Sequence, residues 1–133
     1  MYVDAADRMH GKFWYWNVPY EGATTAFIRS RLNAGDVFLD VGANMGYFTL
    51  MAAKMVGTEG TVLAFEPNPA LVKAVRLSIN RNGWTARAVV DEIALSDRTC
   101  DAREFYLSAD TSNSGLSSFS ENWAQVDSTI APQ

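Results

Sequence analysis

The sequence has 133 residues, of which 48% are hydrophobic and 20% charged, the balance of one globular domain rather than a fibre or a disordered tail. Eleven Lys and Arg residues against fifteen Asp and Glu residues give a net charge of −4, which argues against a nucleic-acid partner. A single cysteine and a single histidine leave no cluster for a metal site. There is no apolar run of membrane length and no signal-peptide core, so we expect a soluble, cytoplasmic protein with no membrane partner.

Residues 1–33 combine an aromatic leader with a short helix. The helix is predicted over 22–32, where Ala26, Phe27 and Leu32 have near-helical spacing. The aromatic density of the leader is too high for a disordered segment, so we expect the leader to pack on the rest of the domain.

Residues 34–107 alternate short strands with helices. Apolar, β-branched runs predict strands over 37–41, 61–65 and 86–90, the first of them buried on both faces of a parallel sheet. Helices are predicted over 47–56 and from Pro69 to the Asn82-Gly83 stop. This alternation is typical of half of a doubly wound α/β sheet with strand order 3-2-1.

The helix that starts at Pro69 carries the clearest local signals. Asn68 is a suitable N-cap, and Pro69 suits the first helical position, which needs no amide donor. The inward-facing residues are predicted to be Leu71, Val72, Val75, Leu77 and Ile79. The residues predicted to face solvent are Lys73, Arg76 and Arg81.

The chain after the third strand is less patterned. Residues 103–107 predict one more strand, antiparallel because no crossover helix precedes it. Residues 108–133 form a polar loop and C-terminal segment, either a linker or the rim of a site. We therefore expect one domain over 1–133, with parts at 1–33, 34–107 and 108–133.

The main functional signal is the segment Asp40-Val-Gly42-Ala-Asn44-Met-Gly46, at the turn from the first predicted strand into a helix. Ligands of doubly wound sheets bind at this edge. Gly42 and Gly46 allow close approach of the backbone to a ligand, and Asn44 tolerates positive φ. Because the next helix points its first amides at this turn, we expect a small anionic ligand group there.

Spacing and charge separate the candidate ligands. A G-x-G-x-x-G dinucleotide pattern from Gly42 needs glycines at Asn44 and Tyr47, so a nicotinamide-dependent enzyme is disfavoured. Asp40 would repel a pyrophosphate and attract the ammonium of a methionine-like group, although it could equally cap the next turn. Glu66 ends the second strand, where it could accept ribose hydroxyl protons or be a solvated strand end. S-adenosylmethionine carries both the methionine ammonium and the ribose.

Four blocks of the sequence, at residues 35–49, 60–69, 80–83 and 94–97, resemble a known family in their order and spacing. They are similar to class I S-adenosylmethionine-dependent methyltransferases, most closely to the FkbM-type methyltransferases, over residues 20–107. The resemblance implies methylation of a hydroxyl on a small molecule or glycan, with S-adenosylmethionine as cofactor. A non-catalytic module that binds an adenosyl ligand is the alternative function.

The resemblance also implies a set of cofactor-binding residues. They are Asp40, Gly42, Ala43, Asn44, Gly46, Glu66, Pro67, Asp91 and Glu92. Glu66 is expected at the ribose, and Asp91 or Glu92 near the adenine. Tyr20 and Glu21 match a Tyr-Glu pair of the family and are candidates for the acceptor side, whereas no catalytic base is identified.

The resemblance stops before the block that begins the family's fourth strand. We therefore expect an α/β, doubly wound, Rossmann-like parallel sheet that is truncated after the third βα unit. The strand over 37–41 would then have a free apolar edge, and such edges recruit a strand from a partner chain. The chain is therefore expected to be either a truncated methyltransferase or a homo-oligomer that completes its sheet by dimerisation.

Overall fold

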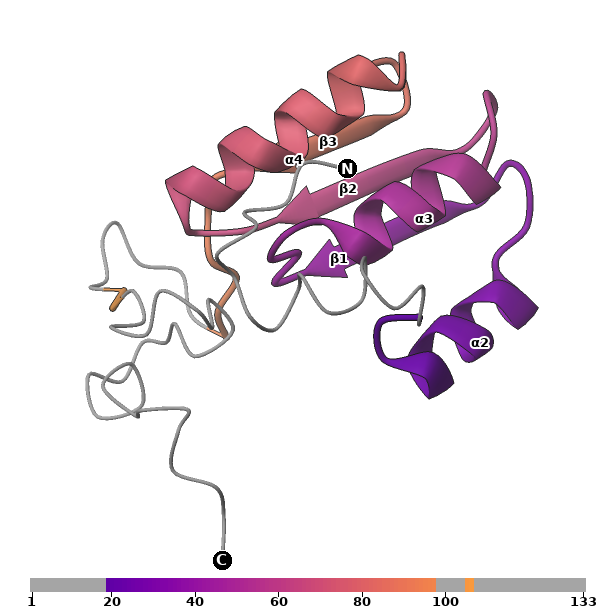
Figure 1. The fold of residues 1–133 in the computed structure, drawn as a ribbon, viewed down its shortest axis with the longest axis horizontal. Helices are drawn as coiled ribbons and strands as arrows, with labels where there is room; N and C mark the ends of the chain where they lie inside the picture. The colour runs from indigo at the N-terminus through magenta and orange to yellow at the C-terminus, as the bar shows by residue number, and fades with distance from the viewer. Residues whose placement is uncertain (1–18, 98–104, 107–133) are drawn as a thin grey trace, which may run out of the picture.

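The structure is a computed structural model that describes residues 19–97 and 105–106 (Figure 1). The elements are, in order, α2 (Gly22–Arg31), β1 (Val37–Val41), α3 (Tyr47–Met55), β2 (Thr61–Phe65), α4 (Pro69–Arg81) and β3 (Ala88–Asp91). The aromatic leader before residue 19 and the segment 108–133 lie outside the described residues. Of the strand predicted over 103–107, only Phe105 and Tyr106 are described, and Tyr106 forms a single β-bridge.

The strands form a parallel sheet in the order β1-β2-β3. The register pairs Asp40 with Ala64, and Ala64 with Val90. Helices α3 and α4 lie on the same face of this sheet (Figure 1), with α3 packed on β1 and β2 and α4 on β3. This arrangement confirms the predicted Rossmann-like parallel sheet and its strand order, and it brings the carboxyl ends of all three strands to one edge.

The core lies between the sheet and the two helices. Side chains alternate along each strand, so Val62, Ala64, Ala88 and Val90 point under the helices and are buried. Val72 and Val75 of α4 are fully buried against them. The α4 cap is confirmed as well, because Asn68 Oδ1 accepts the Ala70 N–H at 3.0 Å with Pro69 in the first turn.

The opposite face of the sheet differs from the prediction. Val37, Leu39 and Val41 were expected to be buried on a fully covered strand, but they are 62%, 58% and 62% exposed. The reason is that, among the described elements, α3 and α4 cover only the other face. Strand β1 is also an outer strand of the described sheet, and its completion by a partner chain stays a prediction.

Two apolar residues of the helices lie on the solvent side, and one of them, Leu77, was expected to face inward. Leu77 is 42% exposed and Phe27 is 63% exposed. Leu77 is two residues from both Val75 and Ile79, which turns it by about 200° from each of them. Phe27 has the same relation to Thr25, the buried residue of α2. In each helix the exposed apolar residue therefore lies on roughly the opposite side from these buried residues.

Strand β3 starts two residues later than predicted. The amides of Arg87 and Ala88 donate to the carbonyl of Trp84 at 3.0 and 2.9 Å, so residues 84–87 form a turn. The turn therefore delays the start of β3 to Ala88, although the carbonyl of Arg87 already accepts the N–H of Val62 in β2 at 2.7 Å.

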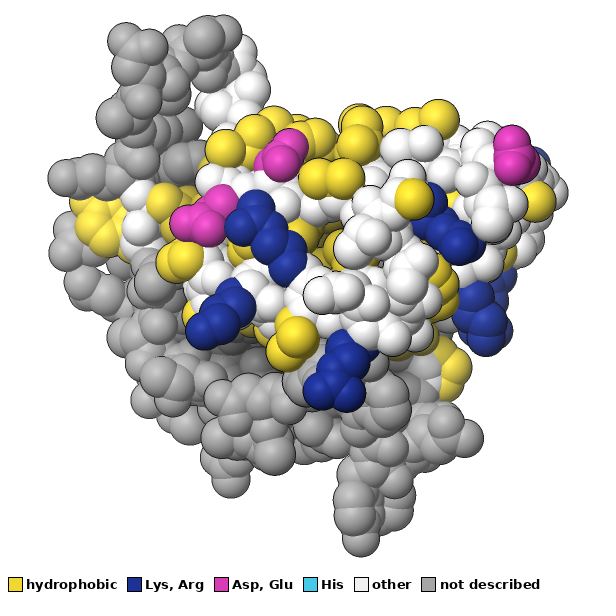
Figure 2. Space-filling view, turned by 90° about the horizontal axis from the view of Figure 1, so that it is seen from above, with side chains coloured by type: hydrophobic (Ala, Val, Ile, Leu, Met, Phe, Trp, Pro, Cys, Tyr) yellow, Lys and Arg dark blue, Asp and Glu magenta, His cyan; other side chains and the backbone are white. Residues whose placement is uncertain are grey.

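The helix layer carries cations without anions. Helix α4 contains Lys73, Arg76 and Arg81 and helix α3 contains Lys54, while neither helix contains an Asp or Glu. Figure 2 shows Lys and Arg side chains spread over the face that is uppermost in Figure 1, where Asp and Glu side chains of other segments are also visible. Within the described part of the chain, no helix is long and apolar enough to cross a membrane.

Candidate cofactor site

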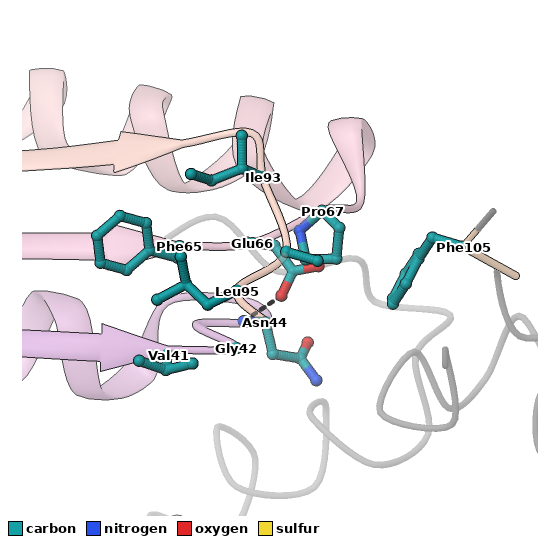
Figure 3. A pocket seen from close by; sticks show the side chains of 10 residues that line it. Val41, Gly42, Asn44, Phe65, Glu66, Pro67, Ile93, Leu95 and Phe105 are labelled. Carbon is teal, nitrogen blue, oxygen red and sulfur yellow. Dashed lines mark hydrogen bonds between the residues drawn. The ribbon is translucent and has the colours of Figure 1, made fainter. Parts of the chain in front are cut away.

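A pocket of about 230 Å³ opens at the carboxyl ends of β1 and β2 (Figure 3). It is lined by Val41, Gly42, Asn44, Phe65, Glu66, Pro67, Ile93, Ala94, Leu95 and Phe105. The segment after β3 supplies Ile93 and Leu95 by turning back toward the ends of the other two strands (Figure 3). Four of the predicted cofactor-binding residues thus lie together: Gly42, Asn44, Glu66 and Pro67.

Glu66 is fixed at the centre of this edge. Its backbone N–H donates to the carbonyl of Asp91 at 3.0 Å, which continues the pairing of β2 with β3. Its side chain is only 6% exposed, and Oε2 accepts the Asn44 N–H at 2.8 Å while Oε1 accepts the Asn68 N–H at 2.9 Å. The carboxylate therefore joins the loop after β1 to the loop after β2.

The loop after β1 turns its amides toward β2. The N–H groups of Gly42 and Ala43 both donate to the Phe65 carbonyl, at 2.9 and 3.0 Å, and Asn44 follows with its bond to Glu66. Asn44 has φ of 51°, the positive value that it was expected to tolerate, and Gly42 has φ of 78°. Open space surrounds the position of a Cβ on Gly42, which leaves the pocket side of the loop accessible.

Gly46 and Ala43, two other predicted cofactor-binding residues, do not line the pocket. Gly46 is the N-cap of α3 with φ 81°, and a Cβ on it would lie 2.7 Å from Cγ2 of Val75. The missing side chain therefore allows α3 to begin against α4. Ala43 is 6% exposed and belongs to the core.

Asp40 points away from the pocket, under α3. It is 8% exposed, and its Oδ2 accepts the Thr49 hydroxyl at 2.5 Å. Burial raises the pKa of Asp40 above 3.8, while hydrogen bonds from the Thr49 side chain and backbone N–H act in the opposite direction. Because Gly46 has no side chain to cap α3, Asp40 supplies that cap from the preceding strand. This is the capping alternative from the sequence; contact with a methionine ammonium stays a prediction.

The carboxylates expected near an adenine are exposed, and neither lines the pocket. Asp91 and Glu92 face solvent at the end of β3, while the next residues, Ile93 to Leu95, reach the pocket. The apolar wall formed with Val41 and Phe65 was missed as a site feature. Two features of the sequence could have indicated this wall: the last apolar residue of each of these strands, and the block at 94–97.

An aromatic cluster lies beside the start of α3. The rings of Tyr20, Tyr47 and Phe48 lie 5.3–5.8 Å apart between centroids. Tyr20 also accepts the Thr25 hydroxyl on its carbonyl at 2.6 Å, and Glu21 begins α2 with φ 42°. These contacts fix the Tyr20-Glu21 pair beside α3, and their acceptor-side role stays a prediction. In the described residues, no group of three or more His, Cys, Asp and Glu side chains could hold a metal ion.

The parallel order β1-β2-β3, with a glycine loop after β1 and a buried acid after β2, is that of half of a Rossmann-like fold, the fold of class I S-adenosylmethionine-dependent methyltransferases. A solved SAM-dependent O-methyltransferase from Thermotoga maritima has the same fold, with a TM-score of 0.53 and 21% identity over 65% of this chain and 32% of that chain. The family then follows from the sequence. Residues 1–101 match the protein-L-isoaspartate(D-aspartate) O-methyltransferase (PCMT) family, and the chain belongs to that family. Family and fold together imply S-adenosylmethionine as the cofactor, as the sequence predicted.

Three relatives place the chain more closely. A protein-L-isoaspartate O-methyltransferase of Caenorhabditis elegans is 38% identical over 60 residues, which are 45% of this chain and 27% of that protein. A protein-L-isoaspartate O-methyltransferase of Triticum aestivum is 34% identical over 88 residues, which are 65% of this chain and 37% of that protein. The 31-O-demethyl-FK506 methyltransferase FkbM of Streptomyces tacrolimicus is 44% identical over 66 residues, which are 50% of this chain and 24% of that protein. The chain thus spans less than two fifths of these relatives, and the FkbM-type assignment within the class stays a prediction.

Proposed function

We propose that this protein binds S-adenosylmethionine in the pocket at the ends of β1 and β2 and transfers its methyl group to an oxygen atom of an acceptor. The observation that carries the proposal is the buried carboxylate of Glu66, which lines the pocket at the end of β2 in a chain of the PCMT family. When bound, the cofactor supplies an electrophilic methyl group, and the protein supplies binding and orientation.

The residues of the pocket fit such a ligand. Each oxygen of Glu66 accepts one backbone N–H, and a carboxylate oxygen has a second lone pair that a ribose hydroxyl could use. The apolar side chains of Val41, Phe65, Ile93 and Leu95 suit one face of an adenine ring. The volume of about 230 Å³ is below the roughly 300–1,000 Å³ of most small-molecule sites, so the described pocket would hold part of the cofactor.

The acceptor we favour is the carboxylate of an isoaspartyl residue in a peptide. The family and two of the three relatives carry isoaspartate O-methyltransferase in their names, which supports a carboxyl oxygen. A hydroxyl of a small molecule or glycan is the second candidate, supported by the relative whose name gives 31-O-demethyl-FK506 as the compound methylated.

A methyl-transfer assay tests both acceptors. The full 133-residue chain would be incubated with methyl-labelled S-adenosylmethionine and an isoaspartyl peptide, its aspartyl twin, a polyhydroxylated macrolide or an oligosaccharide. We expect label only in the isoaspartyl peptide. Label in the macrolide or oligosaccharide would favour the second candidate, and label in none, with S-adenosylhomocysteine still bound, would leave the non-catalytic binding module.

The matched control is Gly42→Val, which puts a branched side chain on the open side of the pocket loop. This variant should neither bind S-adenosylhomocysteine nor transfer label. Equal transfer by the variant and the natural protein would contradict the assignment of this pocket.

A further inference from the structure

The backbone amides that the sequence offers to an anionic ligand already donate to groups of the protein. In the loop over 42–46, the N–H groups of Gly42 and Ala43 donate to Phe65 O, that of Asn44 to Glu66 Oε2, and that of Gly46 to Ala43 O. In the first turn of α3, the Thr49 N–H donates to Asp40. Four of the five loop amides, and this helix amide, are therefore occupied.

The Glu66 carboxylate is an anion of the protein itself that accepts one of the loop amides directly. Turns with left-handed residues can offer backbone N–H groups to an anion, and here the Asn44 N–H donates to the Glu66 carboxylate while the two amides before it donate to the Phe65 carbonyl. Asn44 has φ 51°, a conformation that is uncommon outside glycine. In this conformation its backbone N–H donates to Glu66 Oε2. Figure 3 shows this bond crossing from the loop to the end of β2, with the Asn44 side chain turned away from the carboxylate.

The same carboxylate holds the second loop of the pocket. Oε1 accepts the Asn68 N–H at 2.9 Å, directly before α4. The Glu66 backbone is itself bound to Asp91 of β3 at 3.0 Å. One side chain thus connects the loops after β1 and β2 at a point anchored to the third strand.

We propose that Glu66 is a positioning and specificity-determining residue, an internal anion that fixes both pocket loops in the ligand-free protein and excludes phosphate-bearing nucleotides from the glycine loop. A phosphate here would find the loop amides engaged and a carboxylate beside them, so charge repulsion would add to the lack of donors. A ligand without phosphate, such as an adenosyl thioether, meets neither obstacle. The nucleotide selectivity rests on the proposed function, whereas the loop positioning does not.

The loop positioning is tested on the ligand-free 133-residue chain by amide hydrogen exchange resolved by NMR. Glu66→Gln keeps one acceptor oxygen and replaces the other by an NH₂ group, which cannot accept an N–H. We expect exchange to become about tenfold faster, the size of one lost hydrogen bond, at Asn44 or Asn68. The matched control is Glu59→Gln, an exposed glutamate in the turn before β2, which should change neither amide. Unchanged protection of both amides in Glu66→Gln would overturn the proposal.

The selectivity is tested by calorimetric titration with S-adenosylhomocysteine and with ADP. For the natural protein we expect binding of S-adenosylhomocysteine and at least tenfold weaker binding of ADP. Glu66→Gln should bring the two dissociation constants closer together, whereas a purely structural defect would weaken both in proportion. An unchanged ratio would overturn the specificity role. Failure of the proposed function would appear differently, as no binding of S-adenosylhomocysteine while the Asn44 and Asn68 amides still respond to the substitution.

Discussion

Gly46 at the start of α3 and Val75 in the middle of α4 approach so closely that a Cβ on Gly46 would lie 2.7 Å from Cγ2 of Val75. The glycine loop therefore has two glycines with different tasks. Gly42 has φ 78° and open space around its Cβ position, and Gly46 has φ 81° and none. Both must adopt a left-handed conformation, but only Gly46 is also constrained by packing.

This difference predicts a larger loss of stability for Gly46→Ala than for Gly42→Ala. Gly46→Ala combines a left-handed L-residue, which costs about 1–2 kcal/mol, with overpacking against a buried valine, which costs about 1–3 kcal/mol. Gly42→Ala should lose only the first amount and remain folded, but bind S-adenosylhomocysteine more weakly. Urea unfolding measures the first effect and titration the second. Equal losses of stability in both variants would contradict the packing role of Gly46.

The strand and helix alternation could be predicted from the sequence because its signals are local. The run over 37–41, the Asn68-Pro69 start and the Asn82-Gly83 stop each act within one turn or strand. Adding the helical angle between Leu77 and its neighbours would also have placed Leu77 outside. Element ends and types were therefore accessible, to within one or two residues.

The destinations of particular side chains were not accessible, because they depend on how the elements pack. Asp40 and Glu66 both follow the pattern of strand-end acids, yet Asp40 points under α3 and Glu66 into the pocket. The direction of each side chain depends on which face of the sheet the helices cover. The sequence of the strand does not indicate which face that is. The return of Ile93 and Leu95 to the strand ends likewise depends on a loop path without a local pattern.

The N-cap of α4 yields a prediction about stability alone. Asn68→Ala removes the Oδ1 acceptor of the Ala70 N–H but keeps the backbone N–H that donates to Glu66. We expect a loss of about 1 kcal/mol in the free energy of unfolding, and little change in ligand affinity. Thermal unfolding with and without S-adenosylhomocysteine separates the two. A large loss of affinity at unchanged stability would mean that the side chain itself contacts the ligand.

Arg76 protects the outer edge of the sheet. Its guanidinium donates to the carbonyl of Val90 through Nε at 3.3 Å and Nη2 at 2.9 Å, across from the side of β3 that pairs with β2. Arg76→Ala should cost about 0.5–1.5 kcal/mol, and it should increase self-association because an unprotected edge recruits strands. Lys73→Ala, a change at an exposed cation of the same helix, is the control. Urea unfolding measures the stability and light scattering the self-association. Equal stability and equal self-association of the two variants would contradict this role of Arg76.

Because burial raises the pKa of Asp40 above 3.8, the folded protein holds this proton more tightly than the unfolded chain does. The contribution of Asp40 to stability is therefore largest below about pH 4, and it decreases as the pH rises through the folded-state pKa. Asp40→Asn has no proton to lose, so its stability relative to the natural protein should rise with pH from 3.5 to 7, by about 1.4 kcal/mol for each pKa unit of the shift.

A second variant fixes the cause of this pH dependence. Thr49→Val removes the hydroxyl that donates to Asp40 at 2.5 Å, and so removes one of the two contacts that oppose the effect of burial on the pKa of Asp40. The fall of stability with pH should then become steeper than in the natural protein. Urea unfolding at half-unit steps of pH measures all three proteins. If the stability of Asp40→Asn relative to the natural protein fell as the pH rose, the hydrogen bonds from Thr49 would outweigh burial in setting the pKa of Asp40.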